Sequence, residues 1–204
     1  MKVSLDLHDW SVVNNRMDLL LKLKERFSGF KVSLFTVPVD AKQDWGPYLI
    51  REETLKKVIW PNLDWIQIIP HGYRHNGAEL RRSDYGEFKR LLPDIQAAFD
   101  RDGLPYVKGF CAPHWVWSPG VVKVLDEEGW WGAVDPRHSN ALAPRKIYRY
   151  SHALDTLFSG DIEILKLHGH VYGTRNDLGR CFWNILNVPL AAEWHFVTDF
   201  LEDR

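Results

Sequence analysis

The feature that most limits the fold is an alternation of short apolar runs with amphipathic segments along the chain. The apolar runs are rich in β-branched and aromatic residues, which is typical of strands. They predict strands at residues 3–7, 31–37, 64–69, 106–110, 130–134 and 162–167. Apolar residues at helical spacing predict helices at 17–27, 52–59, 83–100, 119–128 and 189–201. This alternation favours an α/β fold with a largely parallel sheet.

Local signals mark the ends of several predicted helices. Ser83 can cap the long helix at 83–100, and Pro93 within it is expected to produce a kink. Gly129 ends the helix at 119–128. The segment 136–161 shows no clear periodicity, so no element is predicted there.

Size and composition exclude several classes of protein. The 204 residues are expected to form one domain spanning 1–204. With 26 basic and 27 acidic residues the net charge is −1, which argues against a nucleic-acid partner. Two cysteines are too few for a disulfide scaffold. No apolar signal segment or run of ~20 apolar residues is present, so we expect a cytoplasmic protein with no membrane partner.

Titratable side chains cluster directly after five of the predicted strands. Ligands gather beyond the carboxyl ends of strands in sheets of this type, so these clusters are expected to share one face. They lie at residues 6–9 (DLHD), 71–75 (HGYRH), 111–115 (CAPHW), 135–138 (DPRH) and 167–170 (LHGH).

His71 and His75 form the pair most typical of a metal site. They are four residues apart, so their imidazoles can point the same way from one turn. Neutral imidazoles bind zinc and similar divalent ions, and a third, anionic ligand would leave a position open for water. Asp9, at the end of another strand, is the natural third ligand.

In their order along the chain, these segments resemble the motifs of the polysaccharide deacetylase (NodB-homology, carbohydrate esterase) family. The family's first motif is a strand that ends in an Asp-Asp pair. Residues 3–9 occupy that place, with Asp9 at the metal-binding position and His8 where the family has its catalytic-base Asp. The second motif, His-Ser/Thr-x-x-His, corresponds to residues 71–75, with Gly72 at the hydroxyl position.

The later motifs match in part. The third, Arg-x-Pro-aromatic, corresponds to residues 111–114, where Cys111 replaces the Arg. Asp135 is a loose counterpart of the fourth motif, and residues 165–168 reproduce the fifth, Leu-x-Leu-His. The chain therefore looks like a divergent family member. The resemblance implies a distorted (β/α) barrel with about seven strands.

The resemblance also implies an activity, the hydrolysis of an acetyl group by metal-activated water. Asp9, His71 and His75 would hold the divalent ion. Zinc is the expected metal, with cobalt, nickel or manganese as alternatives.

The resemblance suggests a general acid but leaves two candidates for the general base. His8 is the aligned base, but Asp6 lies two residues earlier on the same face of the strand, so both stay open. His168 matches the general acid, and His170 can replace or orient it.

Four further residues are expected to line the substrate site: His114, Trp115, Asp135 and His170. Indole rings can stack on a sugar face. Cys111 cannot make the charge-assisted pair by which the family Arg positions the base, and His114 or Arg137 are the candidates to compensate.

Two functions therefore remain open. The first is a metal-dependent deacetylase acting on an N-acetylated sugar or another small acylated substrate. The second is a protein that keeps the deacetylase fold but binds a glycan or protein without turnover, which the changes at His8 and Cys111 favour. The sequence leaves the oligomeric state open.

Overall fold

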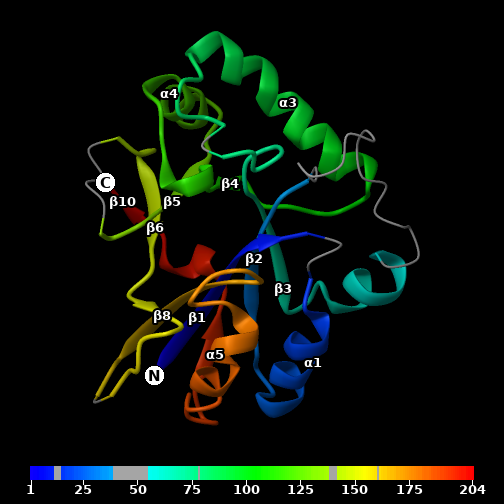
Figure 1. Ribbon diagram of the computed structural model, residues 1–204, viewed down its shortest axis with the longest axis vertical. Helices are drawn as coiled ribbons and strands as arrows, with labels where there is room; N and C mark the ends of the chain where they lie inside the picture. The colour runs from blue at the N-terminus through cyan, green and yellow to red at the C-terminus, as the bar shows by residue number, and fades with distance from the viewer. Residues whose placement is uncertain (12–14, 39–54, 78, 138–141, 160) are drawn as a thin grey trace.

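The computed structural model describes residues 1–11, 15–38, 55–77, 79–137, 142–159 and 161–204. Its larger sheet has six strands in the order β3-β2-β1-β8-β7, with β9 also paired to β1 (Figure 1). These strands are β1 (Lys2–Trp10), β2 (Val32–Thr36), β3 (Ile66–Pro70), β7 (His152–Ala153), β8 (Ile164–His170) and β9 (Glu193–His195). All of their pairings are parallel, which confirms the predicted α/β class.

The smaller sheet has four strands in the order β10-β6-β5-β4. They are β4 (Gly109–Phe110), β5 (Trp131–Val134), β6 (Lys146–Arg149) and β10 (Glu202–Asp203). Backbone hydrogen bonds join it to β3, from Val107 N to Ile68 O (3.1 Å) and from Cys111 N to Pro70 O (3.2 Å). On the other side the chain runs almost directly from β6 into β7. The two sheets are therefore linked on one side by hydrogen bonds to β3 and on the other by the short connection between β6 and β7.

Side chains on β1 alternate between two apolar cores, because successive residues of a strand point to opposite faces. Val3, Leu5 and Leu7 belong to the main core, which includes the buried faces of the helices. Asp6 and His8 point to the other side. That side holds a second cluster, made of Phe35, Ile69, Cys111, Trp131, Ala133, Tyr148, Tyr150 and Val197. The predicted site residues Asp6 and His8 thus lie beside this second, inner core.

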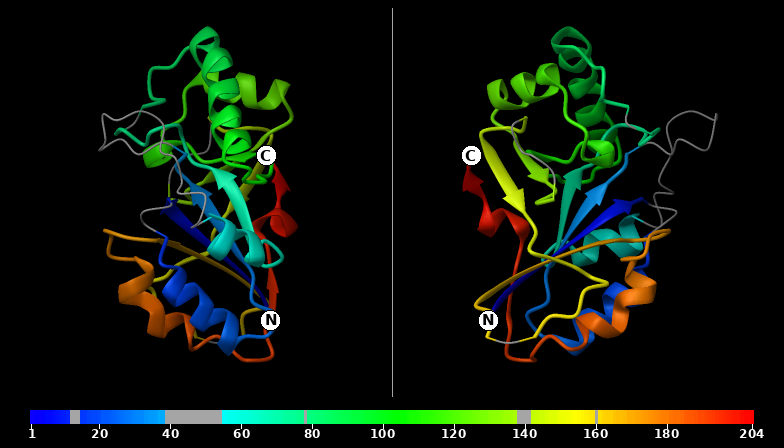
Figure 2. Two further views of the ribbon diagram at one scale, coloured as in Figure 1. Left: turned by 90° about the vertical axis from the view of Figure 1, so that its right-hand side faces the viewer. Right: turned by 60° about the vertical axis from the view of Figure 1, so that its left-hand side comes forward.

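The α-helices of the described residues are α1 (Met17–Arg26), α3 (Tyr85–Arg101), α4 (Pro119–Glu127) and α5 (Leu178–Ile185). α1 packs beside α5 at one end of the molecule, and α3 packs beside α4 at the other (Figures 1 and 2). Short turns complete the fold: η1 (Leu55–Ile59), η2 (Trp60–Asn62), η3 (Pro113–Trp115) and η4 (Val197–Phe200). Of the predicted helix at 52–59, residues 52–54 lie outside the described residues, and the rest is the π-helical turn η1.

The cap of the long helix α3 differs from the prediction. Asp84, not Ser83, caps it: its carboxylate accepts from Glu87 N (2.7 Å), and Glu87 Oε2 accepts from Asp84 N (3.0 Å). This reciprocal capping box satisfies two otherwise unpaired amides. Ser83 instead accepts, through its carbonyl, a hydrogen bond from Ser118 Oγ (2.6 Å). Pro93 lies inside α3, which continues through it.

Two other predictions are corrected, and one helix was missed. The final helix predicted at 189–201 was wrong: this segment contains β9 and η4. β1 extends beyond the paired part of β2, so its residues Lys2–Ser4 offer a free edge that β9 fills. The fourth strand is only Gly109–Phe110, instead of the predicted 106–110, and α5 was not predicted.

Across the described parts of the chain, none of the helices combines the length and the apolar character needed to cross a membrane.

Candidate metal centre and its surroundings

Asp9 lies where β1 loses its regular register. The pairing of β1 with β2 shifts between Leu7 and Trp10, and Asp9 itself has φ 60°. Asp is one of the few residues that tolerate this left-handed conformation. This irregularity changes the direction of the Asp9 side chain at the end of the strand, so that its carboxylate points toward His71 and His75. Bulges beside functional sites commonly have this effect.

His71 and His75 bring their imidazoles to the Asp9 carboxylate from the loop after β3. The Nε2 atoms of His71 and His75 lie 3.3 Å and 3.2 Å from Asp9 Oδ1. The loop turns sharply at Gly72, which has φ +68°. A Cβ at Gly72 would lie 2.3 Å from Glu79 Oε1 and 2.6 Å from Pro113 Cγ, so this loop leaves no room for the hydroxyl residue usual at that position.

Hydrogen bonding leaves a lone pair of His71 directed at Asp9. His71 Nδ1 donates to the carbonyl oxygen of Cys111 (2.9 Å), so in the neutral ring Nε2 is the unprotonated nitrogen. Metal-binding histidines are oriented in this way by a carbonyl or carboxylate. Burial and the neighbouring His71 lower the pKa of His75, which favours the neutral form of that ring.

The carboxylate of Asp9 is charged and incompletely satisfied. Asp9 Oδ1 is buried and has no hydrogen-bond partner. A buried anionic oxygen that faces the lone pairs of imidazole rings raises the free energy of the folded protein, unless a cation lies between these groups and binds them. The chemistry of Asp9, His71 and His75 therefore fits a divalent metal ion.

A second arrangement, beside the first, links Asp6 to His168. His168 Nδ1 donates to Asp6 Oδ1 at 2.6 Å, and the hydroxyl of Tyr148 donates to Asp6 Oδ2 at 3.0 Å. Asp6 is only 1% exposed. Burial and the Asp6 charge hold the pKa of Tyr148 well above its usual value, so this phenol stays a donor. Both oxygens of Asp6 are thus engaged, and Nε2 of His168 is left free.

His8 lies between these two arrangements. Its ring stacks on Phe35 at 4.3 Å and lies 4.8 Å from the rings of both His71 and His168. Its Nε2 is 3.2 Å from Asp6 Oδ1 but has no hydrogen-bond partner. Burial, and then the neighbouring histidines, hold the pKa of His8 well below its usual value. This imidazole is therefore neutral.

His170 approaches the carboxylate of Asp9 from β8. Its Nε2 lies 3.8 Å from Asp9 Oδ2, and its Nδ1 donates to Asn176 Oδ1 at 3.0 Å. Thr174 Oγ1 donates to the same amide oxygen (2.8 Å), which fixes its orientation. Burial lowers the pKa of His170 below its ordinary value.

Asp135 reaches the site through a neighbour. Its carboxylate accepts hydrogen bonds from the Arg137 guanidinium and from the Tyr150 hydroxyl (3.0 Å). Although burial raises the pKa of Asp135, these partners lower it to about 2. The Tyr150 ring stacks on His168 with centroids 4.4 Å apart. Asp135 therefore holds the ring that covers one face of His168.

His114 and Trp115 lie in η3, and both have positive φ, 56° and 60°. The His114 ring lies 5.4 Å from that of His75, and Trp115 lies 4.8 Å from His8 and 5.4 Å from His168. A cavity of about 530 Å³ opens beside this group, and its lining includes Trp115, Arg137, Tyr150, His168, His170 and Asn176.

The structure places every predicted site residue around this centre. Sequence reasoning missed Tyr148, Tyr150 and Asn176. Tyr148 and Tyr150 come from the segment 136–161, where the alternation Ile147, Tyr148, Arg149, Tyr150 was the available signal of a strand. His138, also in the predicted clusters, lies outside the described residues.

Comparison with known proteins identifies the fold. No protein-family model matches the chain, and no curated protein matches it. Among solved structures, a peptidoglycan N-acetylglucosamine deacetylase matches with TM-score 0.61 and 12% identity, over 97% of this chain and 86% of that one. A family 4 acetyl xylan esterase from Clostridium thermocellum with a cobalt ion matches with TM-score 0.56 and 13% identity, over 98% and 89%.

A third match is a family 4 pseudoenzyme from Bacillus anthracis, with TM-score 0.57 and 13% identity, over 97% of this chain and 64% of that one. The chain therefore has the fold of the family 4 carbohydrate esterases and polysaccharide deacetylases, which confirms the predicted fold.

Proposed function

We propose that the protein is a divergent family 4 deacetylase, a metal-dependent hydrolase that removes an acetyl group from an N-acetylated sugar or a related small substrate. The observation that carries this proposal is the approach of the His71 and His75 Nε2 atoms to within 3.3 Å and 3.2 Å of a buried, unsatisfied oxygen of Asp9. Asp9, His71 and His75 are the proposed ligands, and zinc is the expected ion.

A divalent cation held there would lower the pKa of a water from 15.7 toward ~7 and polarise the carbonyl of the substrate. The protein's own residues then have to move two protons. A base must accept one as the attacking oxygen forms its bond to the acyl carbon. An acid must deliver one to the leaving amine.

His168 is the proposed acid, and Asp6 its positioning residue. The hydrogen bond from His168 Nδ1 to Asp6 fixes the ring so that Nε2 can hold and deliver the proton. The buried carboxylate stabilises the positive charge that the ring carries while it holds that proton. Tyr150, stacked on the same ring, and Asp135, bonded to Tyr150, restrict its movement.

His8 is the proposed base. Both oxygens of Asp6 already accept hydrogen bonds, whereas the neutral His8 imidazole has no hydrogen-bond partner at Nε2. Its ring lies between His71 and His168, beside the ligands and the acid. Because burial disfavours its charged form, we expect it to be a weaker base than the carboxylate usual at this position.

The substrate is proposed to enter the cavity of about 530 Å³, a volume usual for a small-molecule site. The Trp115 ring can pack on a sugar face, and His170 lines the same cavity as a polar contact, whereas His114 lies beside His75 and outside this lining. In this proposal Asp135 acts on the substrate indirectly, through Tyr150.

The test is acetate release from N-acetylated sugars and short oligomers by metal-free protein to which zinc, cobalt or nickel is added. We expect activity only with metal, lost in His71→Ala and His75→Ala and kept in His195→Ala, whose side chain lies on β9. A protein that binds metal at Asp9 but releases no acetate from a broad panel of acylated substrates would contradict the enzyme.

That negative result would support the second function, a glycan- or protein-binding module without turnover. The observation in its favour is that a fully buried, neutral His8 occupies the base position. Direct binding of unmodified acetylated oligosaccharide, measured calorimetrically without acetate release, would establish this alternative.

A further inference from the structure

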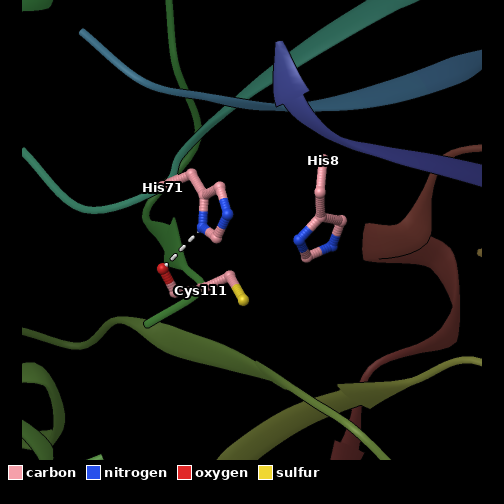
Figure 3. Close-up of side chains that lie close together, drawn as sticks. All are labelled: His8, His71 and Cys111. Carbon is pink, nitrogen blue, oxygen red and sulfur yellow. Dashed lines mark hydrogen bonds between the residues drawn. The ribbon is translucent and has the colours of Figure 1, made fainter. Parts of the chain in front are cut away.

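We propose that the protein has a second, inner cation site, formed by His8, His71 and Cys111, that takes a soft, thiophilic ion such as Cd²⁺ or Cu⁺ (Figure 3). One nitrogen or sulfur atom from each residue lies within 4.8 Å of the other two. This site goes beyond the proposed deacetylase function. It is distinct from the Asp9 centre, with which it shares only His71.

Three separate segments bring these ligands together. His8 comes from β1, His71 follows β3, and Cys111 follows β4. The two imidazole rings lie edge to face, with centroids 4.8 Å apart and 78° between their planes, and Figure 3 shows the Cys111 thiol directed into the space beside them. The bond from His71 Nδ1 to the Cys111 carbonyl (2.9 Å) ties two of the three ligand residues together. The site is therefore largely preformed, which reduces the cost of ordering it around an ion.

Ligand chemistry separates the inner site from the outer one. The outer set contains a carboxylate, whereas the inner set offers two imidazoles and a sulfur. Sulfur ligands favour soft ions over Mg²⁺, Ca²⁺ and Mn²⁺. His8 and His71 are 1% and 3% exposed and Cys111 is 0% exposed. Binding would release the thiol proton to solvent, and the resulting thiolate would offset part of the ion's charge.

Hydrogen bonding within the protein leaves His8 only partly satisfied. Its Nε2 lies 3.2 Å from Asp6 Oδ1 but makes no hydrogen bond. The Cys111 thiol donates a hydrogen bond to the Ala112 carbonyl at 3.5 Å, which it would give up on losing its proton to bind an ion. Both residues also depart from the deacetylase motifs: His8 replaces an Asp and Cys111 an Arg. The two departures lie beside each other and together create a ligand set that neither would provide alone.

Sharing of His71 makes the two sites mutually exclusive. Because Nδ1 donates to the Cys111 carbonyl, the ring has one lone pair, on Nε2, and can bind one ion at a time. The Asp9 side chain is 31% exposed, so the outer site is accessible to ions from solvent. A soft ion held inside would compete with zinc at the outer site.

The experiment is an anaerobic titration of metal-free protein with Cd²⁺, followed by the sulfur-to-cadmium charge-transfer absorption in the ultraviolet. We expect one equivalent to produce this band in the unmodified protein and in Cys181→Ser, which removes the other cysteine. Cys111→Ser should lose the band and bind Cd²⁺ at least about ten-fold more weakly. Asp9→Asn should keep the band.

Competition supplies the second measurement. We expect the apparent dissociation constant of Zn²⁺, measured with a chromophoric chelator, to rise as Cd²⁺ is added to the unmodified protein. In Cys111→Ser this dependence should weaken. Absence of the band from the unmodified protein, or a band that survives in Cys111→Ser, would overturn the inner site. Neither outcome depends on acetate release, so the deacetylase proposal is judged separately.

Discussion

Replacing Asp6 with Asn tests the link between the buried carboxylate and His168. Asp6 accepts from His168 Nδ1 at 2.6 Å and from Tyr148 Oη at 3.0 Å, and it is 1% exposed. Hydrogen bonds to a charged group are each worth about 1.5–3 kcal/mol. Asn keeps one acceptor oxygen and turns an amide N–H toward the other donor. We therefore expect Asp6→Asn to lose about 2–4 kcal/mol of unfolding free energy.

The same substitution should affect catalysis more than stability alone explains. If the Asn amide faces His168, the ring must adopt the tautomer protonated at Nε2, and the stabilising charge is gone. A comparable loss of a buried Asp partner in other hydrolases lowers kcat by about 10⁴. We expect a fall of about 10²–10⁴ in the kcat for acetate release.

Tyr148→Phe is the matched control. It removes one hydroxyl from Asp6 and leaves the His168 bond in place, so it should cost about 1–2 kcal/mol with kcat changed by only a few fold. Urea unfolding at pH 7 measures stability, and ¹⁵N NMR of the imidazoles reports the tautomer. The reasoning is refuted if Asp6→Asn loses under 0.5 kcal/mol with an unchanged His168 tautomer.

Three further predictions concern the ion, pH and packing. Zinc at ~100 Kd should stabilise the protein by about 2.7 kcal/mol, raising Tm by roughly 5–10 °C in a thermal melt; the rise should vanish in His75→Ala and persist in His195→Ala. Because the folded pKa of Asp135 is about 2, its contribution is present above about pH 4 and lost as pH falls toward 2. Asp135→Asn should therefore cost about 1–2 kcal/mol in urea unfolding at pH 7, and this gap should close at low pH; a pH-independent gap would contradict it. A Cβ at Gly109 would lie 2.2 Å from an indole ring, so Gly109→Ala should lower stability by about 1–3 kcal/mol, whereas Gly29→Ala, with nothing within 4 Å, should not.

The amino-acid sequence by itself determined the architecture and the main cluster. Alternating strand and helix patterns predict a parallel α/β fold because each pattern reflects which face of an element is buried. The carboxyl ends of parallel strands meet at one edge, so the sequence alone predicts that Asp9, His71 and His75 lie together. Local periodicity and spacing are sufficient for both conclusions.

The tertiary structure decided which partners each side chain has. That Asp6 is bonded to His168 and Tyr148 depends on β6 and β8 meeting β1 across more than 140 residues of chain, which no local pattern encodes. The predicted final helix became β9 for the same reason, since the free edge of β1 outweighs a weak helical pattern.

The tertiary structure also shows how His8 and Cys111 are related. In the sequence they are two separate substitutions in two different deacetylase motifs. In the folded protein they are buried beside His71, with one nitrogen or sulfur atom of each residue within 4.8 Å of the other two, which is the geometry on which the proposed inner site rests. Sequence spacing can indicate which residues reach the same edge of a sheet. Only the packed interior determines which donors end up within reach of one another.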